Sequence, residues 1–166
     1  NREPPLKEVK QYRPDGTVVD LKPIEKPELN CSIAYFLYQG GVNIIGAVKE
    51  PSAYDPAWYK PWYPNASWVT GPPKLSLGYA KIVICAGDEE NTEESGMISW
   101  AKVTGQGLEI VPLVNPFALH VGDTFEAALL YNGVPVNGSY AAAQATHSMH
   151  PPEGQEGKTA EDGTFS

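Results

Sequence analysis

The sequence has few cysteines and no long apolar segment. Its two cysteines, Cys31 and Cys85, lie far apart, so they do not form a zinc motif, which needs clustered ligands. They are compatible with a disulfide in an oxidising compartment or with two buried thiols. No run of 18 or more apolar residues is present, so we expect no membrane insertion of this chain.

Enzyme motifs are also lacking. We find no acid–base pair, no Ser/His/Asp arrangement and no glycine-rich phosphate loop in a recognisable context. Ser148 follows His147, but neighbours in sequence seldom face each other as a catalytic triad requires. We therefore expect a non-enzymatic protein with no catalytic residues.

Positive charge is scarce. Lys and Arg number 12 against 20 Asp and Glu among 166 residues, which gives a net charge of −8. An acidic surface repels phosphate backbones, so we expect no nucleic-acid binding, and solubility is the simplest role of the charge. The chain begins at Asn1 rather than Met, which indicates a processed or trimmed form. The lack of a signal peptide therefore says nothing about export.

Turn signals and short apolar runs are abundant. With 16 Gly, 16 Pro and 42% hydrophobic residues, the composition favours many short strands around a packed core and leaves no long helical pattern. The Pro-Asp-Gly segment 14–16 predicts the turn of a first hairpin, and Asn132-Gly133 predicts a tight hairpin turn because both residues must adopt positive φ. We predict an all-β protein.

The strand pattern predicts two sandwich-like modules. Residues 1–105 form the first, an N-terminal β-sandwich module, and residues 106–166 form the second, with an immunoglobulin-like or prealbumin-like fold. A strand opens at residue 164 and the chain stops at 166, which leaves open that the second module is incomplete at its C-terminus. The strands expected are 9–12, 17–21, 31–38 and 42–48 (a central hairpin), 75–86, 97–103, 108–114, 124–131 and 139–146.

Aromatic residues and prolines concentrate in residues 49–73. Prolines at this density interrupt strands and helices, so we predict a long loop. Its aromatic side chains suit stacking on a carbohydrate or anchoring a protein partner, although packing as a lid over a sheet edge is the simpler interpretation. The candidates for ligand binding are Trp58, Tyr59, Trp62, Tyr63 and Trp68.

The His-Ser-Met-His segment 147–150 is the best metal candidate. Imidazole binds nickel, cobalt, copper and zinc, and a thioether suits Cu(I). Because Pro151 disfavours a helical backbone at the preceding residue, we predict a loop around one ion. The candidate ligands are His147, Met149 and His150, with His120 as a further one. The alternative is a solvated loop that merely contains histidines. The acidic segment 88–94 lacks the spacing of a calcium loop, which favours a solvated loop there too.

Residues 108–138 carry a family resemblance. The residues concerned are the Leu-Glu-Ile-Val-Pro-Leu run at 108–113, Asn115, Pro116, Leu119, Gly122, Asp123, Leu130, Gly133, Pro135 and Gly138. With residues 14–21 and the strand after the Pro-Pro-Lys step at 72–74, the chain resembles a bacterial exported family formerly of unknown function. Its members are NikK-like periplasmic accessory components of nickel and cobalt uptake. Most of the matching residues are structural glycines, prolines and core positions, so the fold transfers better than the function.

This resemblance implies an exported protein, periplasmic or extracellular, that binds nickel or cobalt or presents it to a membrane metal-uptake transporter. The chain departs from the family at two positions. Relatives often carry a histidine just before the Leu-Glu-Ile run and another near the mature N-terminus, whereas Gln106-Gly107 precedes Leu108 here and Asn1 opens the chain. The alternative function is an extracellular carbohydrate- or protein-binding module that uses the aromatic loop.

Overall fold

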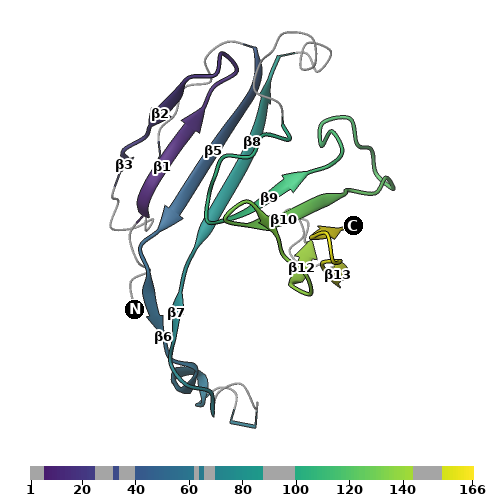
Figure 1. Ribbon diagram of the computed structural model, residues 1–166. Coiled ribbons are helices and arrows are strands. Elements are labelled where there is room, and N and C mark those ends of the chain that lie inside the picture. Colours follow the sequence, from purple (N-terminus) through teal and green to yellow (C-terminus); the bar gives the residue numbers. More distant parts are fainter. Residues whose placement is uncertain are drawn as a thin grey trace.

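A computed structural model gives the fold, and it describes residues 6–24, 32–33, 40–61, 64–65, 70–87, 100–143 and 155–166. Within these residues the regular secondary structure is β-strand except for one short 3-10 helix (Figure 1). The all-β prediction is confirmed. Over the same residues, no helix has the length and apolar character that crossing a membrane requires.

A four-stranded antiparallel sheet is the largest unit. Its strand order is β2-β1-β5-β8. The strands are β1 (Leu6–Tyr12), β2 (Val18–Asp20), β5 (Gly41–Lys49) and β8 (Tyr79–Ala86). The predicted first hairpin is confirmed: β1 and β2 pair around residues 14–16, and Asp15 Oδ1 accepts hydrogen bonds from Thr17 N at 2.9 Å and Thr17 Oγ1 at 2.7 Å.

The neighbours of β5 differ from the prediction. Strand β5 pairs with β1 from Ile44 to Lys49 and with β8 from Gly41 to Val48. The described part of the predicted partner, β4 (Ser32–Ile33), pairs instead with β3 (Pro23–Ile24), and residues 34–38 lie outside the described residues. The predicted hairpin is therefore wrong for residues 32–33. Continuous hydrophobicity indicates a buried strand but does not say which strands flank it.

Part of the predicted loop at 49–73 is an ordered arm. Strands β6 (Ser52–Tyr54) and β7 (Lys74–Ser76) pair with each other, and the 3-10 helix Pro56–Tyr59 follows β6. Asp55 Oδ1 caps this helix by accepting from Ala57 N at 2.9 Å. The arm extends the line of β5 and β8 away from the large sheet (Figure 1). Prolines flank these short strands without lying inside them, which is why the ladder survives.

The second sheet is built around β10. Strand β10 pairs with the three other strands of the sheet, always antiparallel. The strands are β9 (Leu108–Pro112), β10 (Ala127–Tyr131), β11 (Val134–Pro135) and β14 (Thr164–Phe165), and a separate hairpin joins β12 (Tyr140–Ala143) to β13 (Gln155–Lys158). Asn132 at φ 50° and Gly133 at φ 78° form the β10–β11 turn, as the Asn-Gly pair predicts.

A buried hydrophobic cluster lies on one face of the four-stranded sheet, here called the inner face. Val42 and Ile44 of β5 are fully buried on it, and Val83 of β8 lies beside them. Side chains from outside the sheet, Trp100 and Phe117, pack against this cluster. The segment that leads into β9 thus runs across the inner face. The predicted division at residues 105 and 106 falls within that segment, and the two-module organisation stays a prediction.

Candidate functional site

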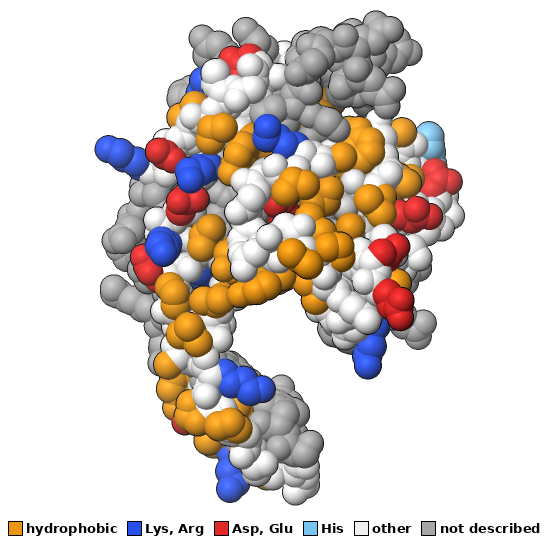
Figure 2. All heavy atoms as spheres, in the orientation of Figure 1, with side chains coloured by type: hydrophobic (Ala, Val, Ile, Leu, Met, Phe, Trp, Pro, Cys, Tyr) orange, Lys and Arg blue, Asp and Glu red, His pale blue; other side chains and the backbone are white. Residues whose placement is uncertain are grey.

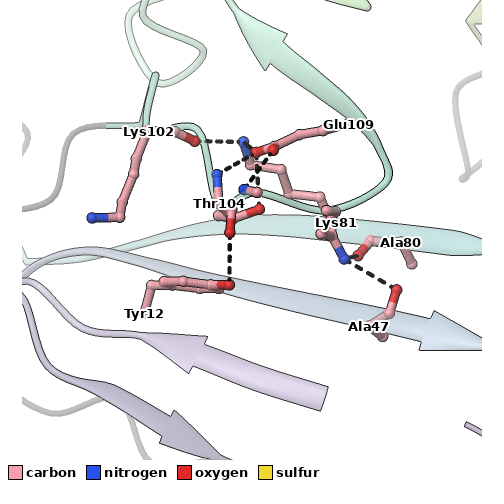
Figure 3. Close-up of polar contacts among 9 residues, drawn as sticks. Tyr12, Ala47, Ala80, Lys81, Lys102, Thr104 and Glu109 are labelled. Carbon is pink, nitrogen blue, oxygen red and sulfur yellow. Dashed lines mark hydrogen bonds and ion pairs between the residues drawn. The ribbon is translucent and has the colours of Figure 1, made fainter. Parts of the chain in front are cut away.

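A buried ion pair joins the two sheets. Lys81 Nζ of β8 lies 2.7 Å from Glu109 Oε1 of β9, and their side chains are only 7% and 1% exposed. Lys81 also donates to the carbonyl of Lys102 at 2.8 Å (Figure 3). Glu109 Oε1 accepts from Thr104 N and Oγ1 at 2.8 and 2.9 Å, while Oε2 accepts from Gly105 N at 3.1 Å.

These contacts keep Glu109 ionised. Burial is the largest single influence and favours the neutral acid, but the hydrogen bonds from Lys81 and Thr104 together outweigh it. The pKa of Glu109 is therefore held below its ordinary value. Because the carboxylate is paired and fully hydrogen-bonded, the geometry is that of a structural lock rather than of a proton donor or acceptor for chemistry.

Gln106 is the second polar anchor of this region. Its Nε2 donates to the carbonyl oxygens of Ala47 and Ala80, each at 3.1 Å, so the amide nitrogen faces the four-stranded sheet. Gly46 of β5 makes room for it, since a Cβ there would lie 3.1 Å from that nitrogen. The amide orientation is set by the two carbonyls, which only the NH₂ group can satisfy.

A pocket of about 330 Å³ opens beside these anchors, between β8 and the second sheet. Its walls are mostly apolar, with Leu108 and Ile110 of β9 on one side and Phe125 of the β9–β10 connection at the edge. These three side chains are 39%, 47% and 39% exposed. Figure 2 shows hydrophobic side chains gathered over the region where the two sheets meet.

One close approach shapes the pocket wall. The ring of Tyr79 lies directly over the backbone of Gly107, where a Cβ would come within 2.5 Å of the phenolic oxygen and 2.8 Å of Cζ. Only glycine permits this contact without displacement of the ring. Tyr79 lines the pocket, so Gly107 determines the position of the Tyr79 ring in the pocket wall.

Among the predicted metal ligands, the structure describes His120 alone. It lies on an exposed turn with its side chain 89% exposed, and Asp123 Oδ2 is 3.6 Å from Nδ1. The same carboxylate accepts from His120 N at 2.8 Å and so holds the turn. His147, Met149 and His150 lie outside the described residues. In the part of the chain that is described, no group of three or more His, Cys, Asp or Glu side chains is placed to hold a metal ion.

The aromatic candidates are divided in the same way. Trp58 lies on the 3-10 helix of the arm and is 52% exposed. Tyr59 belongs to the same helix, whereas Trp62, Tyr63 and Trp68 lie outside the described residues.

The acidic segment 88–94 and Cys31 also lie outside the described residues. Cys85 is half-buried in β8. The structure therefore leaves both alternatives for the cysteines, a disulfide or two thiols, as they stood from the sequence.

The inter-sheet pocket and its anchors escaped the sequence analysis. One signal was present in the sequence. Glu109 interrupts an otherwise apolar run, and a carboxylate in such a run must either pair with a buried partner or point toward water. Its partner Lys81 lies 28 residues away, and no sequence pattern singles Lys81 out. The spacing of residues along the chain therefore could not have predicted this ion pair.

Comparison with known proteins gives one match. A family model described as "Domain of unknown function (DUF4198)" matches residues 1–166, the whole chain. Neither a curated protein nor a solved structure matches the chain.

Proposed function

The chain belongs to the DUF4198 family of domains of unknown function, and from that premise we propose that it is an exported, non-enzymatic accessory protein that binds nickel or cobalt ions and presents them for uptake. The ion is cargo in this proposal, handed on to a membrane transporter. The observation that supports it most directly is the exposed His120–Asp123 turn, which lies within the segment that resembles nickel and cobalt accessory proteins.

The geometry of this turn suits an imidazole ligand. Asp123 lies on the Nδ1 side of the His120 ring, which leaves Nε2 facing solvent. A carboxylate on the side of the non-ligating nitrogen is a common neighbour of metal-binding imidazoles in proteins. Asp123 and Glu126 are both exposed, and Figure 2 shows acidic side chains along the flank that carries the histidine. Such a flank raises the local concentration of cations.

One imidazole does not retain an ion for long, so the proposal assigns the remaining ligands to His147, Met149 and His150. Imidazole suits Ni²⁺ and Co²⁺, and reversible coordination by a few groups on turns fits a protein that must release its cargo. Since ligand imidazoles must be neutral, binding weakens below about pH 6.

Calorimetric titration of the untagged protein with Ni²⁺ and Co²⁺ tests the proposal. We expect a saturable isotherm that weakens in His120→Ala and is lost in the double variant His147→Ala/His150→Ala. Asp123→Asn should weaken binding, whereas Asp162→Asn is the matched control, because Asp162 caps an exposed turn through Thr164 in the same way without a histidine. A flat isotherm for the unaltered protein would end the proposal.

A second candidate function is carbohydrate or protein binding by the arm. The exposed indole of Trp58 favours it, because an exposed, rigid aromatic side chain at the end of a projecting arm is suited to stacking on a sugar or anchoring a partner. Polysaccharides should then change the tryptophan fluorescence of the protein but not of Trp58→Phe. Trp100, packed against the core, is the internal reference. An unchanged spectrum across a broad polysaccharide panel counts against this function.

A further inference from the structure

The inter-sheet pocket has the dimensions and the walls of a small-molecule site. At about 330 Å³ it reaches the lower end of the range of ligand pockets in proteins, roughly 300–1,000 Å³. It lies between parts of the chain that are far apart in sequence, with Tyr79 and Val83 of β8 facing Leu108 and Ile110 of β9. A mostly apolar cavity with a few convergent polar groups is the usual form of such a site.

The alternation over the first three residues of β9 is inverted relative to ordinary core packing. Glu109 is 2% exposed, whereas its neighbours Leu108 and Ile110 remain 39% and 47% exposed. A strand normally buries its apolar side chains and exposes its charged ones. Here the charged residue is used for the lock with Lys81, and the apolar residues line the pocket. The exposed apolar area at the pocket therefore follows from the fold and is not a scatter of single surface residues.

The charges in the pocket wall are already neutralised. Lys81 and Glu109 pair with each other, and the carboxylate accepts all its remaining hydrogen bonds from Thr104 and Gly105. No charge of this pair is left to attract an ionic ligand, so the wall favours a neutral one.

The amide of Gln106 offers no free polar contact to the pocket. The residue lines the pocket, but its Nε2 is bound to two sheet carbonyls and its Oε1 is buried out of reach of a ligand. The wall therefore presents a mostly apolar surface.

We infer that this pocket binds a neutral, mainly apolar small molecule. The apolar body of the molecule covers Leu108, Ile110 and Phe125. This site is distinct from the proposed metal-binding turn, because neither His120 nor Asp123 lines the pocket. Its function does not depend on the metal cargo.

The test uses N-phenyl-1-naphthylamine, a neutral apolar fluorophore with a single N–H, and the full chain in the presence of EDTA. We expect a saturable rise in its emission. Ile110→Ser should weaken binding about tenfold, within the range that a change of apolar contact produces. Ile82→Ser is the matched control and should leave binding within about twofold. Ile82 is also an exposed strand isoleucine, at 55%, but it lies on the opposite face of β8 from Lys81 and Val83.

The inference is overturned by no saturable emission, or by equal weakening in Ile110→Ser and Ile82→Ser.

Discussion

The two ends of the inner face are built differently. At the end where β5 begins, Val42 and Ile44 are at most 1% exposed and pack against Trp100 and Phe117. At the opposite end, where β8 begins, contact between the sheets is made by a buried ion pair, and the apolar side chains of β9 stay partly exposed around a pocket. One end excludes water by close packing, whereas the other joins the sheets through directed polar contacts.

Because of this difference, one end of the inner face contributes stability and the other end can contribute a ligand site. Close packing leaves no space for a ligand, because interiors are about as dense as organic crystals. A polar lock holds two sheets together at a defined distance while apolar surface beside it stays accessible. The polar end of the face is therefore where a ligand site can exist without loss of the core.

The largest effect is expected when the lock is broken. Glu109→Ala leaves Lys81 buried without its counter-charge, which should lower the free energy of unfolding by about 3–5 kcal/mol. Urea denaturation measures it. The double variant Lys81→Met/Glu109→Leu removes both charges and should be clearly more stable than Glu109→Ala. Equal stability of the two variants would show that packing, not the uncompensated charge, is responsible.

The next largest effect is expected in the packed end. Ile44→Ala should destabilise the protein by about 2–5 kcal/mol, because a buried isoleucine leaves a cavity when it is truncated. Ile82→Ala, which truncates an exposed side chain in the paired strand β8, should change stability by about 0.5 kcal/mol or less. Similar losses in the two variants would contradict the burial of Ile44 in the cluster on the inner face.

A smaller effect is expected at the contact between Tyr79 and Gly107. Gly107→Ala places a Cβ within 2.5 Å of the phenolic oxygen, and the overpacking should destabilise the protein by about 1–3 kcal/mol. Replacing the ring as well, in Tyr79→Leu/Gly107→Ala, should recover part of the loss. Thermal unfolding of the single and double variants measures the coupling, and strictly additive losses would argue against the contact.

The smallest effect is expected from pH. Because the folded-state pKa of Glu109 lies below its ordinary value of 4.5, its contribution to stability is present above about pH 4.5 and is lost as pH falls through the folded-state pKa. The stability of the protein should therefore decline with acidification below that value. The decline should be shallower in Glu109→Gln, which cannot titrate. Denaturation curves between pH 3 and 6 that fall with the same slope in both proteins would contradict the role of Glu109.

Local features of the fold were predictable because they arise from neighbouring residues. The turns at 14–16 and at Asn132-Gly133 follow from the backbone preferences of these residues, and both are found. The neighbours of β5 were mispredicted, because apolar residues can pair with any strand that offers a matching face. The arm was taken for a loop, because short strands between prolines carry little periodicity.

The candidate sites likewise contain features that were predictable from the sequence and features that were not. His120 was identified from its residue type alone, but its exposure and the position of Asp123 beside its ring came from the turn. The pocket was not predicted, because Lys81 lies on a strand far in sequence from Gln106 and Glu109, and no motif links them.

By itself the sequence determined the all-β class, the hairpin turns and the acidic, cysteine-poor character of this DUF4198 member. These properties depend on local backbone preferences and on composition, which act without knowledge of distant partners. Only the tertiary structure decided that Glu109 is buried while Leu108 and Ile110 line a pocket. The physical reason is that burial depends on what the fold places opposite each side chain, and for Glu109 that is a lysine from another sheet.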